Sequence, residues 1–281
     1  MKPLPPNPYM TATRMPAFFL CHGGGPWPWM QGPLREGLRG LERGLLAVPG
    51  QLPRRPDAIV VVSAHWEAPA FAVTSAAAPG MVYDYSGFPP EMYRIRYPSP
   101  GQPALAQRMV DMLSAAGCPA ATDAQRGYDH STYSVLQTMY PQADIPVVQL
   151  SLHAGLDPAL HIRAGAALAP LRDENILIIG SGMTCHERGP EMAAYSGPFD
   201  EWVHQVVQDS DQQRREHALT HWEQAPHARA VHPHEDHFLP LLVAVGAARG
   251  DTATAIYRER LMGFIASSSY RFGEATRELA A

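Results

Sequence analysis

The chain has 281 residues and a mass of 30.7 kDa, which is enough to bury a sizeable hydrophobic core. Hydrophobic residues make up 46% of the sequence and charged residues 17%, with a formal net charge of -5 and no cluster of Lys or Arg, which argues against nucleic acid or an anionic membrane as a partner. The longest apolar runs are too short to span a bilayer.

Cysteine content and the first residues bear on the compartment. Three cysteines cannot build a disulfide framework, so we expect a protein of the reducing cytoplasm. Residues 1–15 lack the apolar core of a signal peptide, and we interpret them as a Pro-rich arm.

Short apolar runs bounded by Gly and Pro alternate with longer segments of helical character. The runs are rich in β-branched residues and continuous, which is typical of central strands covered on both faces. In chain order we expect a strand at 17–21, a helix at 30–48, strands at 58–63 and 70–75, a helix at 102–117, a strand at 146–152, a helix at 158–172, a strand at 176–181, helices at about 199–223 and 236–248, and one or two strands within 253–261 and 266–273.

This alternation predicts an α/β fold with a largely parallel or mixed central sheet flanked by helices. The helix at 158–172 opens with Asp157 and Pro158, a capping residue followed by proline at the first helical position. No repeat or linker interrupts the sequence, so we expect one domain over residues 1–281.

Three histidines share one placement, each just past a buried strand. His22, His65 and His186 follow the runs that end near residues 21, 64 and 185. Ligands of open α/β sheets bind beyond the carboxyl ends of the strands, where loops from distant parts of the chain meet. One such histidine would be an ordinary hydrogen-bonded residue, whereas three of them favour a metal site.

The residues beside these histidines have simpler explanations. The triple glycine at 23–25 is neither GxGxxG nor a P-loop, and it favours a sharp turn that lets a ligand or metal approach the backbone. Cys21 and Cys185 would point to the opposite face from the neighbouring histidines, so we expect buried core thiols.

The segment 232–241, HPHEDHFLPL, is dense in possible ligands. If a helix begins at residue 236, His237 lies in its first turn and faces the core together with Leu241. We therefore expect His237 to be a ligand, and His232 and His234 to lie at the rim. Other histidines fall in a polar stretch and are predicted to be solvated: His204, His217, His221 and His227.

Two further segments are candidates for the pocket. In the aromatic, Pro-rich loop 83–101, Arg94 and Arg96 alternate with Tyr93 and Tyr97, which suits a flat anionic ring, or else marks a rigid surface loop. His130 follows Asp129 at a predicted helix start. It is either a capped structural histidine or a proton donor at the pocket edge.

Taken together, the motifs resemble the class III extradiol ring-cleavage dioxygenases, over nearly the whole chain and in order. The nearest subgroup is the 4,5-DOPA dioxygenase-like one, related to the catalytic subunit of protocatechuate 4,5-dioxygenase. The motifs are 20-LCHGGG-25, 63-SAHWE-67, 83-YDYSGFPPEMYRIRYPSPG-101, 127-GYDHSTYSVL-136, 147-VVQLSL-152, 178-IIGSGMTCH-186 and 232-HPHEDHFLPL-241.

The resemblance implies a single α/β domain with a mononuclear non-haem Fe(II), which inserts both atoms of O2 into a catechol-type ring in aromatic-compound catabolism. The family's metal positions fall on His22, His65 and His237, with His186 joining them when zinc occupies the site. In the protocatechuate enzymes the position of His186 is an acid/base instead, and His130 matches a pocket histidine. Relatives occur as monomers and small oligomers.

The sequence departs from the family in two places. Relatives commonly read Gly-Asn-Val-Val-His or Gly-Met-Ser-Phe-His where this chain has 182-GMTCH-186, so the histidine is kept and its neighbours differ. Protocatechuate-type relatives supply a carboxylate as third ligand, whereas here His237 stands at that place beside Glu235 and Asp236. Three histidines and a 2-His-1-carboxylate triad therefore both remain open.

The chemistry expected of these parts has three roles. Three neutral imidazoles leave positions on the metal for a catecholate and O2. His186 is placed to act as general base, His130 to donate a hydrogen bond or proton, and Arg94 or Arg96 to meet a substrate carboxylate. A zinc-dependent hydrolase or zinc-binding protein using the same histidines is the alternative, and a silent small-molecule binder a third.

Overall fold

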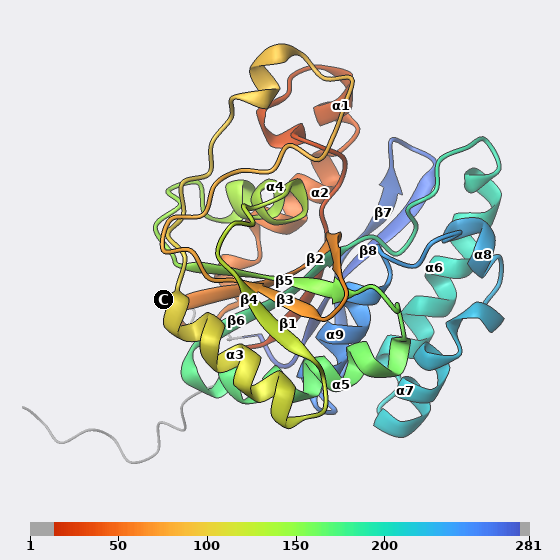
Figure 1. The fold of residues 1–281 in the computed structure, drawn as a ribbon. Helices are drawn as coiled ribbons and strands as arrows, with labels where there is room; N and C mark the ends of the chain where they lie inside the picture. Colours follow the sequence, from red (N-terminus) through yellow and green to blue (C-terminus); the bar gives the residue numbers. More distant parts are fainter. Residues whose placement is uncertain (1–13, 276–281) are drawn as a thin grey trace, which may run out of the picture.

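The structure is a computed structural model that describes residues 14–275. Within these residues the fold is built around a single mixed sheet (Figure 1). It has eight strands in the order β4-β3-β5-β2-β6-β1-β8-β7. Their bounds are β1 Ala17–Cys21, β2 Ala58–Ala68, β3 Phe71–Thr74, β4 Ala120–Asp123, β5 Val147–His153, β6 Ile176–Gly182, β7 Ala253–Leu261 and β8 Ile265–Phe272.

The four central strands run parallel, because β5 pairs with β2, β2 with β6, and β6 with β1 in the same direction. At one side the β7–β8 hairpin joins β1 antiparallel, and at the other β3 joins β5 antiparallel. The prediction of an α/β fold with a largely parallel or mixed sheet is confirmed. Parallel central strands end at one edge, which is where loops from distant parts of the chain meet.

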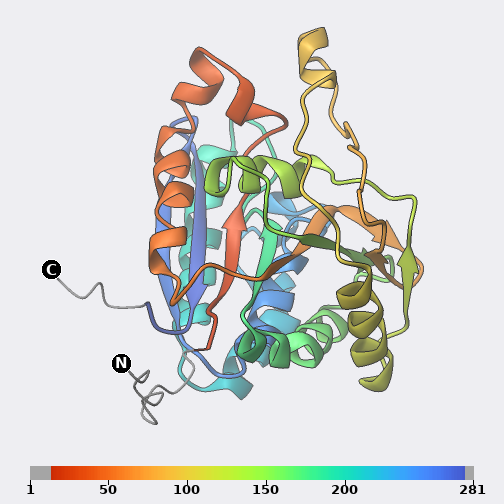
Figure 2. The ribbon, with the colours of Figure 1, turned by 90° about the vertical axis from the view of Figure 1, so that its left-hand side faces the viewer.

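Helices lie on both faces of the sheet (Figures 1 and 2). On one face α2 and α4 pack against β7 and β2, and on the other α9 packs against β6 and β1 and is itself covered by α5. In Figure 2, β1 points toward the end of the molecule at which α1 and the 83–101 loop project. The helix bounds are α1 Pro33–Glu36, α2 Arg39–Leu46, α3 Pro103–Ala115, α4 His130–Met139, α5 Pro158–Leu168, α6 Met192–Gln208, α7 Gln212–Thr220, α8 Ala228–Val231 and α9 Leu239–Ala248, with short 3₁₀ turns at Trp27–Trp29, Pro49–Gln51, Pro90–Tyr93, Ala169–Glu174 and Trp222–Gln224.

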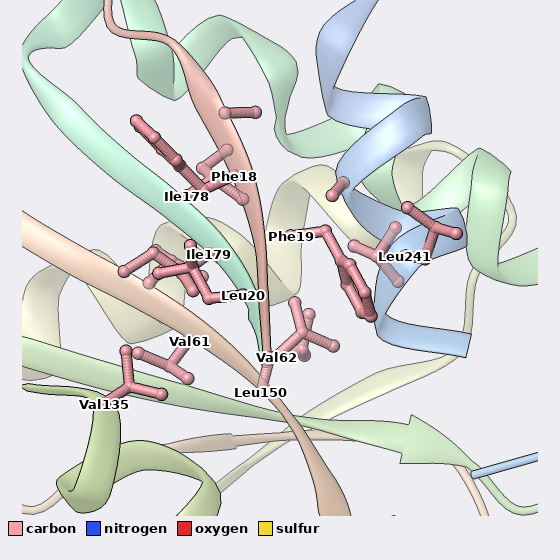
Figure 3. Close-up of a cluster of buried hydrophobic side chains, with 14 of the residues drawn as sticks. Phe18, Phe19, Leu20, Val61, Val62, Val135, Leu150, Ile178, Ile179 and Leu241 are labelled. Carbon is pink, nitrogen blue, oxygen red and sulfur yellow. The ribbon is translucent and has the colours of Figure 1, made fainter. Parts of the chain in front are cut away.

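The core is built from the continuous apolar strands (Figure 3). Phe19 of β1 points toward Leu241 of α9, while Val61 of β2 lies beside Val135 of α4, so both faces of the central strands are buried. This double burial explains why their sequences are apolar without alternation.

Two of the predicted helices are divided. The helix expected at 30–48 begins only at Pro33 and breaks after Glu36, at Gly37, a residue with low helix propensity. The helix expected at 199–223 is α6 followed by α7, because Asp211 caps a new helix by accepting hydrogen bonds from the backbone N–H groups of Gln213 and Arg214. The predicted cap at Asp157 is confirmed.

The helix predicted to start at residue 236 starts at Leu239 instead. Proline has no backbone N–H and is tolerated in the first turn of a helix, so Pro240 sets the start. His237 therefore lies in the turn before α9, and the prediction that it shares a helical face with Leu241 was wrong.

The strand edges also differ from expectation. β2 continues to Ala68, so that His65 lies within this strand rather than past its end. β4 was missed because its sequence, AATD, is short and largely exposed.

Most of the predicted Pro-rich arm lies outside the described residues, although Met15 is buried. No helix within the described part of the chain is long and apolar enough to cross a membrane.

Candidate active site

The carboxyl end of β6 brings two distant histidines together. The backbone N–H of His22 donates to the carbonyl of Gly182 at 3.2 Å, and the N–H of Met183 donates to the carbonyl of His237 at 2.9 Å. A side chain at Gly182 would collide with that carbonyl of His237, so the close approach needs glycine. These two hydrogen bonds hold His22, which follows β1, and the turn before α9, which carries His237, against the same end of β6.

His65 is positioned by an irregularity in β2. The pairing of β2 with β5 shifts register between Val62 and Glu67, which frees the intervening backbone from the ladder. The N–H of His65 donates to the hydroxyl of Ser63 at 3.0 Å, and its carbonyl accepts from Arg126 at 3.1 Å. The buried carboxylate of Asp129 accepts hydrogen bonds from the Ser63 hydroxyl and from the Arg126 guanidinium, so one polar network fixes this segment.

Together these elements gather three imidazoles. Ring nitrogens of His22, His65 and His237 all lie within 4.8 Å of one another, and Nε2 of His65 is 3.0 Å from Nε2 of His237. The three rings come from the residue after β1, from β2 and from the turn before α9, far apart in the sequence. Such a cluster of nitrogen donors is typical of a divalent transition-metal site.

Burial keeps these imidazoles neutral. It lowers the pKa of His22 and of His237 well below the ordinary value, and the neighbouring histidines lower both further. Burial together with His130 also lowers the pKa of His65 to about 3. Both ring nitrogens of His22 are buried and have no hydrogen-bond partner among the described residues. Buried nitrogens without partners are costly in a folded protein, and a bound metal would satisfy one of them.

Asp84, from the 83–101 loop, joins His130 to this cluster. Its carboxylate accepts hydrogen bonds from the backbone N–H of His130 at 3.1 Å and from Nδ1 of the same ring at 2.9 Å, and it lies 3.2 Å from Nδ1 of His65. Burial acts to raise the pKa of Asp84, but the hydrogen bonds and charge of His130 outweigh it and lower that pKa. An ionised Asp84 therefore faces both imidazoles.

His186 lies against the cluster from the loop after β6. Its ring stacks on that of His237, with centroids 3.5 Å apart and an interplanar angle of 12°. Burial lowers the pKa of His186, and the nearby Asp236 partly opposes this. Asp236 also lies 3.0 Å from Nδ1 of His237, without hydrogen-bond alignment.

A cavity of about 450 Å³ opens onto these rings. The side chains of His22, His65, His130 and His186 reach it. The rest of its lining is largely apolar or aromatic, with one arginine and one aspartate: Gly23, Gly24, Gly25, Leu34, Leu38, Asp84, Tyr85, Ser86, Phe88, Met183, Arg188, Leu261, Met262, Phe264 and Ile265. This mixture suits a small aromatic molecule with a few polar groups.

The triple glycine is required by tight turns and close packing. Gly23 and Gly25 have φ values of +74° and +56°, and a Cβ at these positions would come within 2.8 Å of Trp27 and 2.7 Å of Phe88. Two aromatic rings therefore lie directly against this backbone. The turn predicted from the sequence is confirmed, and the aromatic packing was not foreseen.

The predicted substrate residues of the 83–101 loop lie elsewhere. Arg94 and Arg96 are exposed and are not among the residues that line the cavity. Tyr93 is partly buried beside Tyr83 and Tyr85 and does not line it either. Four other members of this loop do line it: Asp84, Tyr85, Ser86 and Phe88.

His232 was predicted to lie at the rim, and this was wrong. It is fully buried, its Nε2 contacts the carbonyl of Thr184 at 2.8 Å, and its ring packs among Phe199, Trp222 and Phe238. One polar contact and an aromatic surround compensate for the loss of water. His234 is exposed as expected, as are His217, His221 and His227, whereas His204 is partly buried. Cys21 and Cys185 are buried, as predicted.

Sequence reasoning missed Asp84 and Arg188 as site residues. Asp84 lies in a loop whose arginines and tyrosines carried the stronger pattern, and Arg188 follows His186 by only two positions. The position of Arg188 just after His186, a histidine that follows a strand, was the one signal in the sequence that could have identified it.

Comparison with known proteins decides the family. The model described as "Catalytic LigB subunit of aromatic ring-opening dioxygenase" matches residues 17–277. The chain belongs to this family. The resemblance to class III extradiol dioxygenases of the 4,5-DOPA dioxygenase-like subgroup is thus confirmed. A zinc hydrolase on the same histidines is not favoured by membership of this ring-opening dioxygenase family.

Relatives match over most of their length. A protein named 4,5-DOPA dioxygenase extradiol from Portulaca grandiflora is 37% identical over 91% of this chain and 95% of its own. One of the same name from Escherichia coli K12 is 36% identical over 97% of this chain and 100% of its own. The crystal structure of an uncharacterised protein from E. coli K12 superposes with a TM-score of 0.70 at 32% identity, covering 92% of this chain and 100% of that one.

Proposed function

We propose that this protein is an Fe(II)-dependent extradiol dioxygenase that opens the ring of a DOPA-like catechol with O2 in aromatic-compound catabolism. Membership of the ring-opening dioxygenase family and the names of the relatives support the reaction class and an aromatic substrate. The observation that carries the proposal is the convergence of three imidazoles, those of His22 and His237 buried and that of His65 partly buried, beside a cavity with aromatic walls that His22 and His65 line. We further propose that it acts in the cytoplasm, as a monomer or small homo-oligomer.

The donor set fits a metal held by His22, His65 and His237. The two ring nitrogens of His22 have no partner among the described residues, and the close Nε2 atoms of His65 and His237 face each other. Carboxylates lie behind the latter two rings, with Asp84 near Nδ1 of His65 and Asp236 near Nδ1 of His237. A carboxylate that accepts a hydrogen bond from Nδ1 would favour the Nδ1–H tautomer and leave Nε2 as the ligand atom.

We favour three histidines over a triad that includes a carboxylate. Glu235 is bound by the guanidinium of Arg229 at 2.6 Å, and Asp236 caps the backbone N–H of His237 at 2.8 Å. Both carboxylates are thus engaged outside the facing Nε2 atoms. When bound, Fe(II) would supply the redox chemistry that lets triplet O2 react with a closed-shell ring and would lower the pKa of a diol hydroxyl.

Two histidines that line the cavity are left for proton transfer. His186 stacks on His237 and is the proposed general base for the second hydroxyl of the diol. His130 is held through Nδ1 by Asp84, which leaves its other ring nitrogen to hydrogen-bond or protonate the substrate. Each such acid/base role is worth about two to four orders of magnitude in rate.

The test is ring opening by the Fe(II)-loaded protein. After anaerobic loading with Fe(II), addition of a catechol and air should consume O2 and give a yellow ring-opened product, while the zinc-loaded protein should not. His186→Ala should retain Fe(II) and lose about two to four orders of magnitude in turnover. Hydrolysis with zinc and no oxygen uptake with any catechol would establish the zinc enzyme instead.

A further inference from the structure

One cation stands at the cavity. Of the described residues that line it, Arg188 is the single Lys or Arg side chain. It follows His186 by two positions in the loop after β6, and a nitrogen of its guanidinium lies 3.5 Å from where a Cβ of Gly24 would be. The guanidinium therefore reaches across to the glycine turn that follows His22. An arginine side chain offers a positive charge together with a planar fork of N–H donors.

The Arg188 side chain lacks a protein partner. Within residues 14–275 its guanidinium makes no hydrogen bond or ion pair, and only its backbone N–H donates, to the carboxylate of Glu187. The arginine that supports His65 is instead engaged, since Arg126 binds Asp129. The fork of donors on Arg188 is thus available, and forked guanidinium donors match a carboxylate in geometry.

The other fixed charge at the cavity would orient an anionic ligand. The carboxylate of Asp84 is held beside His130 and His65 and would repel an anionic group placed there. With the diol at the imidazoles of the proposed metal site, an anionic side chain is favoured near Arg188 and disfavoured near Asp84.

We propose that Arg188 binds a carboxylate on the side chain of the substrate, and that the preferred substrates are catechols with an anionic side chain. This inference rests on the proposed function and assigns to Arg188 the role that the sequence suggested for Arg94 or Arg96. Those two arginines are exposed and outside the cavity lining.

The experiment compares two matched catechols, one with a propionate side chain and one with a propyl side chain. The ratio of their kcat/KM values is measured with the Fe(II)-loaded wild type, Arg188→Gln and Arg188→Lys. Arg188→Gln should lower the preference for the propionate about ten- to hundred-fold, mainly through KM, and leave the propyl compound little changed. Arg188→Lys keeps the charge and should recover part of the preference.

A surface arginine provides the matched control. Arg54 is exposed and precedes β2, whose amino end is the edge of the sheet away from the cavity, so Arg54→Gln should leave the ratio unchanged. An unchanged ratio in Arg188→Gln, or an equal drop in Arg54→Gln, would overturn the inference. So would a drop in Arg94→Gln or Arg96→Gln in place of Arg188→Gln.

A binding measurement separates this inference from the proposed reaction. Calorimetry on the metal-free protein, with the monophenols that carry the same two side chains, requires no turnover. Arg188→Gln should weaken binding of the propionate compound about ten-fold or more and spare the propyl compound. If the wild type opens no catechol, the proposed function fails, but the calorimetry still tests whether Arg188 binds the carboxylate. Equal affinities of wild type and Arg188→Gln for the propionate compound would refute that contact.

Discussion

At the scale of single residues, the proposed metal ligands depend on what stands behind them. The second nitrogen of a ligating imidazole is commonly held by a partner that fixes the tautomer and the ring orientation. Asp84 stands 3.2 Å behind His65 and also holds His130 by two hydrogen bonds. It is therefore a positioning residue for two rings at once.

Replacing Asp84 should weaken metal binding. Asp84→Asn keeps the shape and removes the negative charge, and we expect about ten- to hundred-fold lower affinity for Zn(II) or Fe(II), measured by competition with a chromophoric chelator. Asp144→Asn is the control, because Asp144 forms an exposed ion pair with Arg55. Equal affinities in wild type and Asp84→Asn would show that this carboxylate does not position the ligands.

A buried histidine away from the site should make stability depend on pH. His161 is fully buried between the carbonyl of Asp157 and the N–H of His153, and burial lowers its pKa to about 4. In the unfolded chain its pKa is near the ordinary histidine value of 6.5, so between these two pKa values the unfolded state binds more protons. The neutral ring therefore contributes stability above pH 6.5 that is lost as the pH falls toward 4.

His161→Gln should reduce this dependence. From pH 7 to pH 5 the wild type should lose roughly 2 kcal/mol of unfolding free energy through this one group. The variant should show a difference between the two pH values that is smaller by about that amount, measured by urea unfolding. His221→Gln, at an exposed histidine, is the control. Identical pH profiles for wild type and His161→Gln would contradict the assignment.

Much of the site was foreseeable residue by residue. His22, His65 and His186 were noticed because each follows an apolar run. In the structure all three line one cavity together with His130, and His237 lies beside His22 and His65. Their binding of a metal stays a prediction. Asp84 and Arg188 were not foreseeable, because a loop's path is set by tertiary contacts and leaves no periodic pattern in its sequence.

At the scale of elements, the junction of β6 with the turn before α9 controls the site. The backbones of His22 and His237 both bond to residues at the end of β6, and Gly182 leaves room for that approach. A single methyl group at Gly182 would push the turn that carries His237 away from the sheet.

Gly182→Ala should therefore lower both stability and metal affinity. Overpacking of this kind costs about 1–3 kcal/mol, measured by urea unfolding, and displacement of His237 should weaken Zn(II) binding beyond what the stability loss explains. Gly50→Ala is the matched control, because a Cβ there would meet no atom within 4 Å. Unchanged zinc affinity in Gly182→Ala would argue against His237 as a ligand.

Element boundaries show where local patterns fail. The buried strands were found because continuous β-branched runs have few alternative structures. The start of α9 was misplaced because the polar residues before it mimic a capped helix, while Pro240 sets the true start. The extension of β2 past Ser63 depends on a register shift against β5, which no single segment encodes.

At the scale of the whole molecule, the parallel order of the central strands explains why distant histidines meet. β1, β2 and β6 run in the same direction toward one edge of the sheet, where β2 carries His65 and the segments that follow β1 and β6 supply His22 and His186. The sequence predicted this α/β class and the edge. It could not predict that the β7–β8 hairpin would contribute Met262 and Phe264 to the cavity wall, because that contact joins segments more than two hundred residues apart in the chain.

The most direct test is a crystal structure of the Fe(II)-loaded protein with anomalous data collected at the iron edge. We expect one strong peak within bonding distance of a ring nitrogen of each of His22, His65 and His237. A second cluster of possible ligands, Glu67, His234 and Asp236, lies toward the surface. A peak there alone, or no peak among the three imidazoles, would contradict the account.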